Sequence, residues 1–111
     1  MPNFFTDNKD LLFHFNNIDL KEIVAYAEDN YEQAKEYNYA PVNYEDAMEN
    51  YRKVLEEVGD ITGNFIAERA VEVDLEGAHY EEGKVDYAAG TQENLERLAK
   101  ADLTGMIFPR K

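Results

Sequence analysis

Apolar residues recur along this chain at the three- and four-residue spacing that is typical of amphipathic helices. The clearest such stripe follows the i, i+3, i+4, i+7 pattern of one buried helix face and consists of Leu20, Ile23, Val24 and Ala27. Asp19 and Glu22 stand at its start in a capping-box arrangement. We therefore expect a helix to begin near Asp19, and an earlier start and a continuation through Tyr31 and Ala34 are both left open.

Two further helices are predicted over residues 43–75, joined as an antiparallel αα-hairpin. Pro41 interrupts the preceding pattern, because the residue before a proline is disfavoured in the α region. Asn43 is placed to cap the first helix, Gly59 to end it and Asp60 to cap the second. Their apolar faces comprise Ala47, Tyr51, Val54, Leu55 and Val58, then Ile61, Phe65, Ile66, Ala70 and Val73.

The periodicity disappears between Gly77 and Gly90, so this stretch is expected to be a loop or a small hairpin. Thr91 is placed to cap a last helix, which leads into an extended apolar tail over residues 103–109. The pattern predicts an all-α fold: a small bundle of about four helices, including the αα-hairpin, with an irregular segment before the last helix. A length of 111 residues favours a single domain.

The net charge of the chain limits the classes of molecule that are expected to bind it. The 24 acidic residues outnumber the 11 basic ones, which gives a formal net charge of −13. Such a chain repels nucleic acid and anionic membrane surfaces, so neither is expected as a partner. The excess acid is expected to serve solubility; the alternative is a surface that steers a basic partner.

Cysteine is absent, which excludes disulfides, thiol nucleophiles and thiolate metal sites. No apolar run approaches the roughly 20 residues that span a bilayer. The N-terminal segment Met1–Asp7 lacks the basic and apolar regions of a signal peptide. A cytoplasmic location is the resulting expectation.

Residues with catalytic or metal-binding potential are scattered. His14 and His79 belong to no paired histidine motif, and the acidic pairs Glu56-Glu57 and Glu81-Glu82 are expected on the solvated surface. No glycine-rich phosphate loop or calcium-loop spacing occurs. Arg52 and Arg69 are expected to pair with glutamates three or four positions away. We therefore predict no catalytic, cofactor-binding or metal site in this chain.

Large apolar residues crowd both ends of the chain. A domain of this size has a limited interior, and exposed apolar patches usually mark docking sites. The chain also ends without a polar tail, which indicates that the polypeptide continues. The predicted interdomain surface consists of Phe4, Phe5, Phe13, Phe15, Met106, Ile107 and Phe108.

The segments that carry these ends resemble a known family. Gly90–Leu95, Leu98 and Ala101-Asp102-Leu103-Thr104-Gly105-Met106-Ile107-Phe108-Pro109 resemble the end of the N-terminal helical domain of acyl-CoA dehydrogenases. There a helix leads into Gly-Leu-x-Gly, a run ending in Pro and a Tyr-Gly-Gly turn. This chain has Asp102-Leu103-Thr104-Gly105 in place of the first element and stops before the last. Residues 1–18 resemble the N-terminal extension of bacterial members, with a short helical segment, and residues 19–111 resemble the helical domain.

The resemblance implies a non-catalytic part of an FAD enzyme that introduces a double bond into an acyl-CoA thioester. The flavin and the catalytic glutamate lie in later domains of that family, so no catalytic residue is carried over to this chain. The implied partners are those domains, the acyl-CoA substrate and an electron-transfer flavoprotein, and a homo-oligomer is left open. The alternative is a free-standing acidic helical module that binds a basic or amphipathic protein through its aromatic ends.

Overall fold

The computed structural model describes residues 2–110, so Met1 and Lys111, at the two ends of the predicted domains, lie outside the described residues. The elements in chain order are α1 (Lys9–Asn17), α2 (Lys21–Ala27), a 3-10 segment η1 (Asp29–Lys35), α3 (Tyr44–Asp60), a π-helical segment η2 (Ile61–Ile66), α4 (Ala67–Glu76), β1 (His79–Glu81), β2 (Lys84–Asp86) and α5 (Ala89–Lys100). The only sheet in the described chain is the two-stranded β1–β2 ribbon. The predicted all-α class is confirmed.

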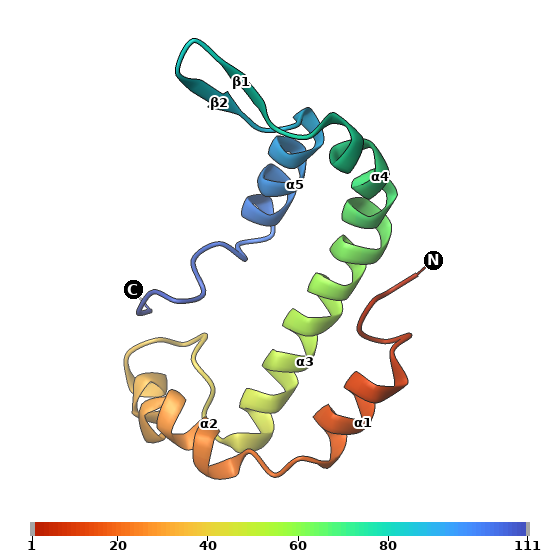
Figure 1. Cartoon of the computed structure of the whole chain (residues 1–111). Coiled ribbons are helices and arrows are strands. Elements are labelled where there is room, and N and C mark those ends of the chain that lie inside the picture. Colours follow the sequence, from red (N-terminus) through yellow and green to blue (C-terminus); the bar gives the residue numbers. More distant parts are fainter. Residues whose placement is uncertain (1, 111) are drawn as a thin grey trace.

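The predicted αα-hairpin over residues 43–75 is wrong in the position of its turn. Asp60, Ile61, Ile66 and Ala67 all keep right-handed helical dihedrals, so α3, η2 and α4 form one continuous rod (Figure 1). Gly59 does not adopt the left-handed conformation that ends a helix. The antiparallel helix pair is formed instead by α4 and α5, with the β-ribbon as their connection (Figure 1).

The glycines of the rod allow an N-terminal segment to pack closely against it. We call this segment, residues 2–8, the strap. The Phe4 amide donates to the Gly59 carbonyl at 3.0 Å, and the Asn3 side-chain amide donates to the Glu56 carbonyl at 3.0 Å. A Cβ atom at Gly59 would lie 2.7 Å from the Phe5 backbone nitrogen, and one at Gly63 would overlap the Pro2 carbonyl oxygen. Only residues without a side chain permit this approach.

Of the predicted caps of the first helices, Asn43 is confirmed, whereas Asp60 lies inside the rod and makes no side-chain cap bond. The Asn43 side chain accepts from the Asp46 amide at 2.8 Å, which confirms the predicted cap of α3. Asn8 caps α1 by accepting from two amides. Asp19 accepts from the Lys21 amide at 3.0 Å, but α2 begins only at Lys21, and its N-cap Leu20 contributes no side-chain bond.

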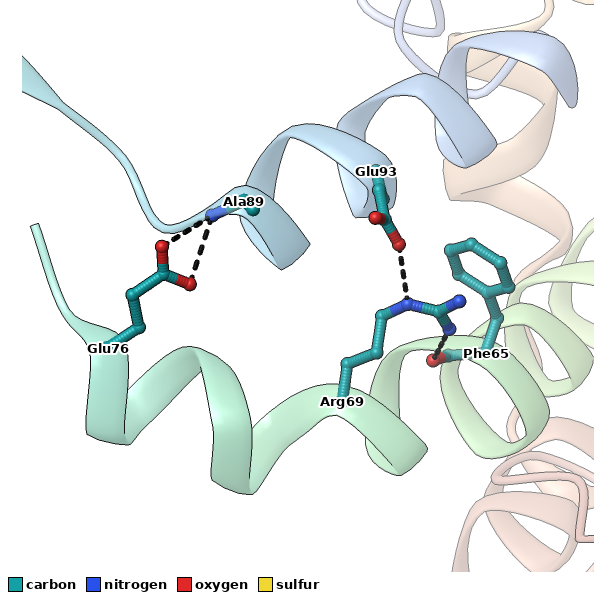
Figure 2. A network of polar contacts seen from close by, with 5 residues as sticks. All are labelled: Phe65, Arg69, Glu76, Ala89 and Glu93. Atoms are coloured by element: carbon teal, nitrogen blue, oxygen red, sulfur yellow. Dashed lines mark hydrogen bonds and ion pairs between the residues drawn. The ribbon is translucent and has the colours of Figure 1, made fainter.

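The segment between α4 and α5 is a hairpin that turns at Glu82 and Gly83, both with positive φ. It projects from the end of the rod, and all six of its strand residues are exposed (Figure 1). The predicted Thr91 cap is wrong, because α5 begins two residues earlier, at Ala89. Its first amide is capped by Glu76 of α4, whose two carboxylate oxygens accept from the Ala89 amide at 3.3 and 3.2 Å (Figure 2).

A second set of contacts fixes α5 along α4. Arg69 donates to Glu93 at 2.9 Å and to the Phe65 carbonyl at 2.9 Å, while its guanidinium lies 3.8 Å from the centre of the Phe65 ring (Figure 2). Gly90 allows the helices to approach, since a Cβ there would lie 2.5 Å from a methyl group of Val73. The α4–α5 pair is therefore defined by a cap, an ion pair and a close glycine contact.

The hydrophobic core of this fold is small. Among the described apolar residues, those that are buried are Phe5, Val24, Ala40, Ala47, Ile61 and Ala88. Three of them are alanines, which bury little area. Phe5 of the strap and Ile61 of the rod are part of this core, whereas Ala88, directly before α5, is the buried apolar residue beside the α4–α5 pair.

We predict that Glu76→Ala lowers the free energy of unfolding by about 1 kcal/mol, because the first amide of α5 loses its acceptor. Urea denaturation followed by circular dichroism measures the change. Glu72→Ala, at an exposed position of the same helix, is the matched control and should stay within about 0.5 kcal/mol of the parent. Equal losses in both variants would show that Glu76 does not act as a cap.

Candidate functional site

One acidic side chain is buried among the described residues. Glu28, directly after α2, is 5% exposed. The Tyr51 hydroxyl of α3 donates to its Oε1, and the Arg110 guanidinium of the C-terminal tail lies 2.7 Å from its Oε2. The same Arg110 nitrogen donates to Gln33 Oε1 at 2.6 Å. Three segments that are distant in sequence, the end of α2, α3 and the C-terminal tail, thus meet at one carboxylate.

The protonation states in this cluster follow from its contacts. Burial alone would raise the pKa of Glu28, but the hydrogen bonds from Arg110 and Tyr51 outweigh it and hold that pKa below its usual value. Burial and the bond to Glu28 raise the pKa of Tyr51, and the Glu28 carboxylate raises that of Arg110. The cluster therefore holds one negative and one positive charge around a neutral phenol, and the lowered pKa makes the Glu28 carboxylate a weak base.

The backbone that follows Glu28 is strained. Asp29, Asn30 and Tyr31 adopt left-handed φ values of 51°, 51° and 64°. Each such residue costs roughly 1–2 kcal/mol, least for the Asp and Asn types. The Tyr31 amide donates to the Glu28 carbonyl at 2.8 Å, which closes the turn. This turn ends α2 at Ala27, so an α-helix does not continue through Tyr31 and Ala34.

A pocket of about 890 Å³ lies beside the cluster. Its charged lining residues, Glu28 and Arg110, neutralise each other. Pockets of this size with few polar groups suit apolar groups. The other lining residues are Phe15, Leu20, Ala27, Gln33, Tyr39, Tyr51, Val54, Leu55, Gly105, Met106, Phe108 and Pro109. Its geometry supports binding of an uncharged apolar group, and it brings no nucleophile and base together.

The arginines do not pair as predicted. Arg52 donates to Asn16 and lies 4.8 Å from the centre of the Phe15 ring, while Arg69 pairs with Glu93 of α5. Both therefore tie the rod to a second helix rather than to a glutamate on their own helix.

The histidines and acidic pairs lie apart from the pocket. His14 and His79 are exposed, and His79 lies 3.3 Å from Glu76. The Glu81-Glu82 pair is exposed in the β-ribbon, and the rod carries Glu56-Glu57. No group of three or more potential metal ligands occurs within residues 2–110.

The predicted interdomain surface is only partly open. Phe4, Phe13, Met106 and Phe108 are between 53% and 69% exposed, and Ile107 is 89% exposed. Phe5 is instead buried and meets Phe15 edge-on, with ring centres 5.8 Å apart. Phe5, in the strap, therefore belongs to the interior of this chain, and half-buried Phe15 of α1 packs against it.

The chain as a whole exposes more surface than a compact protein of its size. Its accessible area is 8568 Å², whereas a folded monomer of 12.8 kDa exposes about 6,300 Å². The radius of gyration is 17.8 Å, against about 13 Å for a compact domain of this length. Large apolar side chains are among the exposed residues, including Val71 and Leu75 on α4 and Tyr26 on α2.

No family model, curated protein or solved structure matches this chain. Among the described helices, none is long and apolar enough to cross a membrane.

We predict that Glu28 stabilises the fold in a pH-dependent way. Because its pKa is lower in the folded chain than the ordinary value of 4.5, its contribution is fully present above pH 4.5 and is lost as the pH falls through the folded-state pKa. At pH 7 the parent should unfold at a higher urea concentration than Glu28→Gln, and the difference should shrink below pH 4.5. Glu22→Gln, at an exposed position of α2, is the control and should show no such pH-dependent difference.

Proposed function

We propose that this chain is a non-catalytic helical module whose exposed apolar surface packs against other protein domains. The observation that carries the proposal is the accessible area, which exceeds that of a compact monomer by roughly 2,300 Å². A standard protein interface takes about 800 Å² from each partner, and obligate interfaces take more and are more apolar. The accessible area in excess of a compact monomer is therefore as large as the area that one partner buries in an obligate interface.

We further propose that the packed domains are those of an acyl-CoA dehydrogenase-like flavoenzyme, located in the cytoplasm. The segment that resembles this family contains Met106, Ile107 and Phe108 near its end, and each of these side chains is more than 60% exposed. In this proposal the module helps to wall the acyl-CoA and FAD site. The other domains hold FAD, supply the catalytic glutamate and pass electrons to an electron-transfer flavoprotein.

The residues around the pocket do not fit a dinucleotide cofactor. Among residues 2–110, Arg110 is the one cationic side chain in the lining, and Glu28 and Gln33 already bind it. The net charge of −13 further opposes a pyrophosphate. We accordingly assign no FAD contact to this pocket, and we expect the isolated 111-residue chain to remain colourless when FAD is added.

The second candidate function is a free-standing acidic interaction module. The combination of exposed apolar residues with a strongly negative net charge favours a partner whose apolar surface is surrounded by Lys and Arg. This candidate shares the exposed surface with the first but places the partner on a separate polypeptide.

We predict that Met106 is covered in the product of the complete reading frame. Its oxidation by hydrogen peroxide, followed by mass spectrometry, should be several-fold slower there than in the 111-residue chain, in which it is 62% exposed. Met48, which is half-buried on α3, is the internal control for peroxide reactivity. The product should also purify with FAD.

The possible results separate the candidates. A reading frame that ends at Lys111 would contradict the flavoenzyme and favour the free-standing module. A longer product that holds FAD but oxidises Met106 as fast as the short chain would contradict packing through this surface. Tight yellow binding of FAD by the 111-residue chain alone would contradict the assignment of the flavin to other domains.

A further inference from the structure

The π-helical segment η2 lies where the N-terminal strap contacts the rod. Continuous helices are normally α-helical, and a π segment places one extra residue in a turn. Three backbone carbonyls at the end of α3, just before this transition, receive donors from outside the helical ladder. They belong to Glu56, Val58 and Gly59.

Two of these donors come from the strap and one from a side chain of the rod. Asn3 donates its side-chain amide to Glu56 O at 3.0 Å, and the Phe4 amide donates to Gly59 O at 3.0 Å. The Thr62 hydroxyl donates to Val58 O at 2.7 Å and to Gly59 O at 3.2 Å. A carbonyl that is drawn toward an external donor tilts out of the ladder, and hydroxyl back-bonding of this kind bends helices.

We propose that the strap and the π-helical segment form one conformational device, in which docking of the strap stabilises η2 in its π form. Release of the strap returns residues 61–66 to an α-helix. Gly59 and Gly63 make docking possible, since a side chain at either position would collide with the strap. The proposal does not depend on the identity of any partner of the chain.

Conversion of η2 from a π-helix to an α-helix would change the orientation of α4, α5 and the β-ribbon relative to α3. Relaxing a π segment moves the following helix by about one residue around its axis, or ~100°. Because α5 is fixed to α4 by Glu76 and Arg69, the α4–α5 pair and the β-ribbon would rotate as a body relative to α3. The strap thereby sets the relative orientation of the apolar surfaces at the two ends of the rod.

The test measures this rotation in the full 111-residue chain. The chain has no cysteine, so Lys53→Cys on α3 and Val71→Cys on α4, both exposed, provide two unique nitroxide positions for distance measurement by electron paramagnetic resonance. Hydrogen exchange at the Phe4 amide reports whether the strap is docked. The strap variant is Asn3→Ala, which leaves the rod sequence intact, and its matched control is Asn17→Ala on α1.

The expected result for Asn3→Ala is faster exchange at the Phe4 amide together with a shift of several ångströms in the distance between the labels. Asn17→Ala should leave both unchanged. Gly63→Ala should act like Asn3→Ala, whereas Gly105→Ala, with no atom within 4 Å of the added methyl group, should not. If the Phe4 amide loses protection while the label distance stays constant, the π segment is independent of the strap and the proposal is overturned. Unchanged exchange in both Asn3→Ala and Gly63→Ala would overturn it equally.

Discussion

The close approach of the N-terminal strap to a glycine-containing face of the rod is the contact on which the other contacts depend. Gly59 and Gly63 leave room for the backbone of the strap. The strap backbone donates a hydrogen bond to the rod and places Phe5 beside Phe15. Ile61, the largest fully buried side chain among the described residues, lies between the two glycines. The small core is thus built around a backbone contact rather than around a cluster of large side chains.

Different kinds of interaction stabilise the two ends of the rod. At one end the buried Glu28 carboxylate collects donors from Tyr51 and Arg110, which offset the cost of burying its charge. At the other end the contacts are exposed, and Glu76 and Arg69 act through a helix cap and an ion pair. Exposed ion pairs contribute little. The α4–α5 end is therefore expected to open more readily than the Glu28 end.

The helices could be predicted from local sequence patterns. The features that could not be predicted depend on contacts between residues that are distant in sequence. The Asn43 cap was predictable because its acceptor and donor lie three residues apart. The prediction that Gly59 ends a helix is wrong because glycine occurs both at helix ends and at close backbone contacts. The contact with the strap, which the sequence does not reveal, is what Gly59 permits here. The Glu28–Arg110 pair and the Glu76 cap join residues that no periodicity relates. The pocket beside Glu28 was missed for the same reason, since its lining comes from segments throughout the chain.

The β-ribbon between α4 and α5 has a consequence for how this molecule tolerates change. Its strand residues are exposed on both faces, and its turn is formed by Glu82 and Gly83. The contacts that fix α5, through Glu76 and Arg69, lie outside the ribbon. Exposed turns whose backbone supports nothing else accept insertions readily. A peptide tag or a reporter domain can therefore be inserted between Glu82 and Gly83, which offers a site for labelling the chain away from both of its ends.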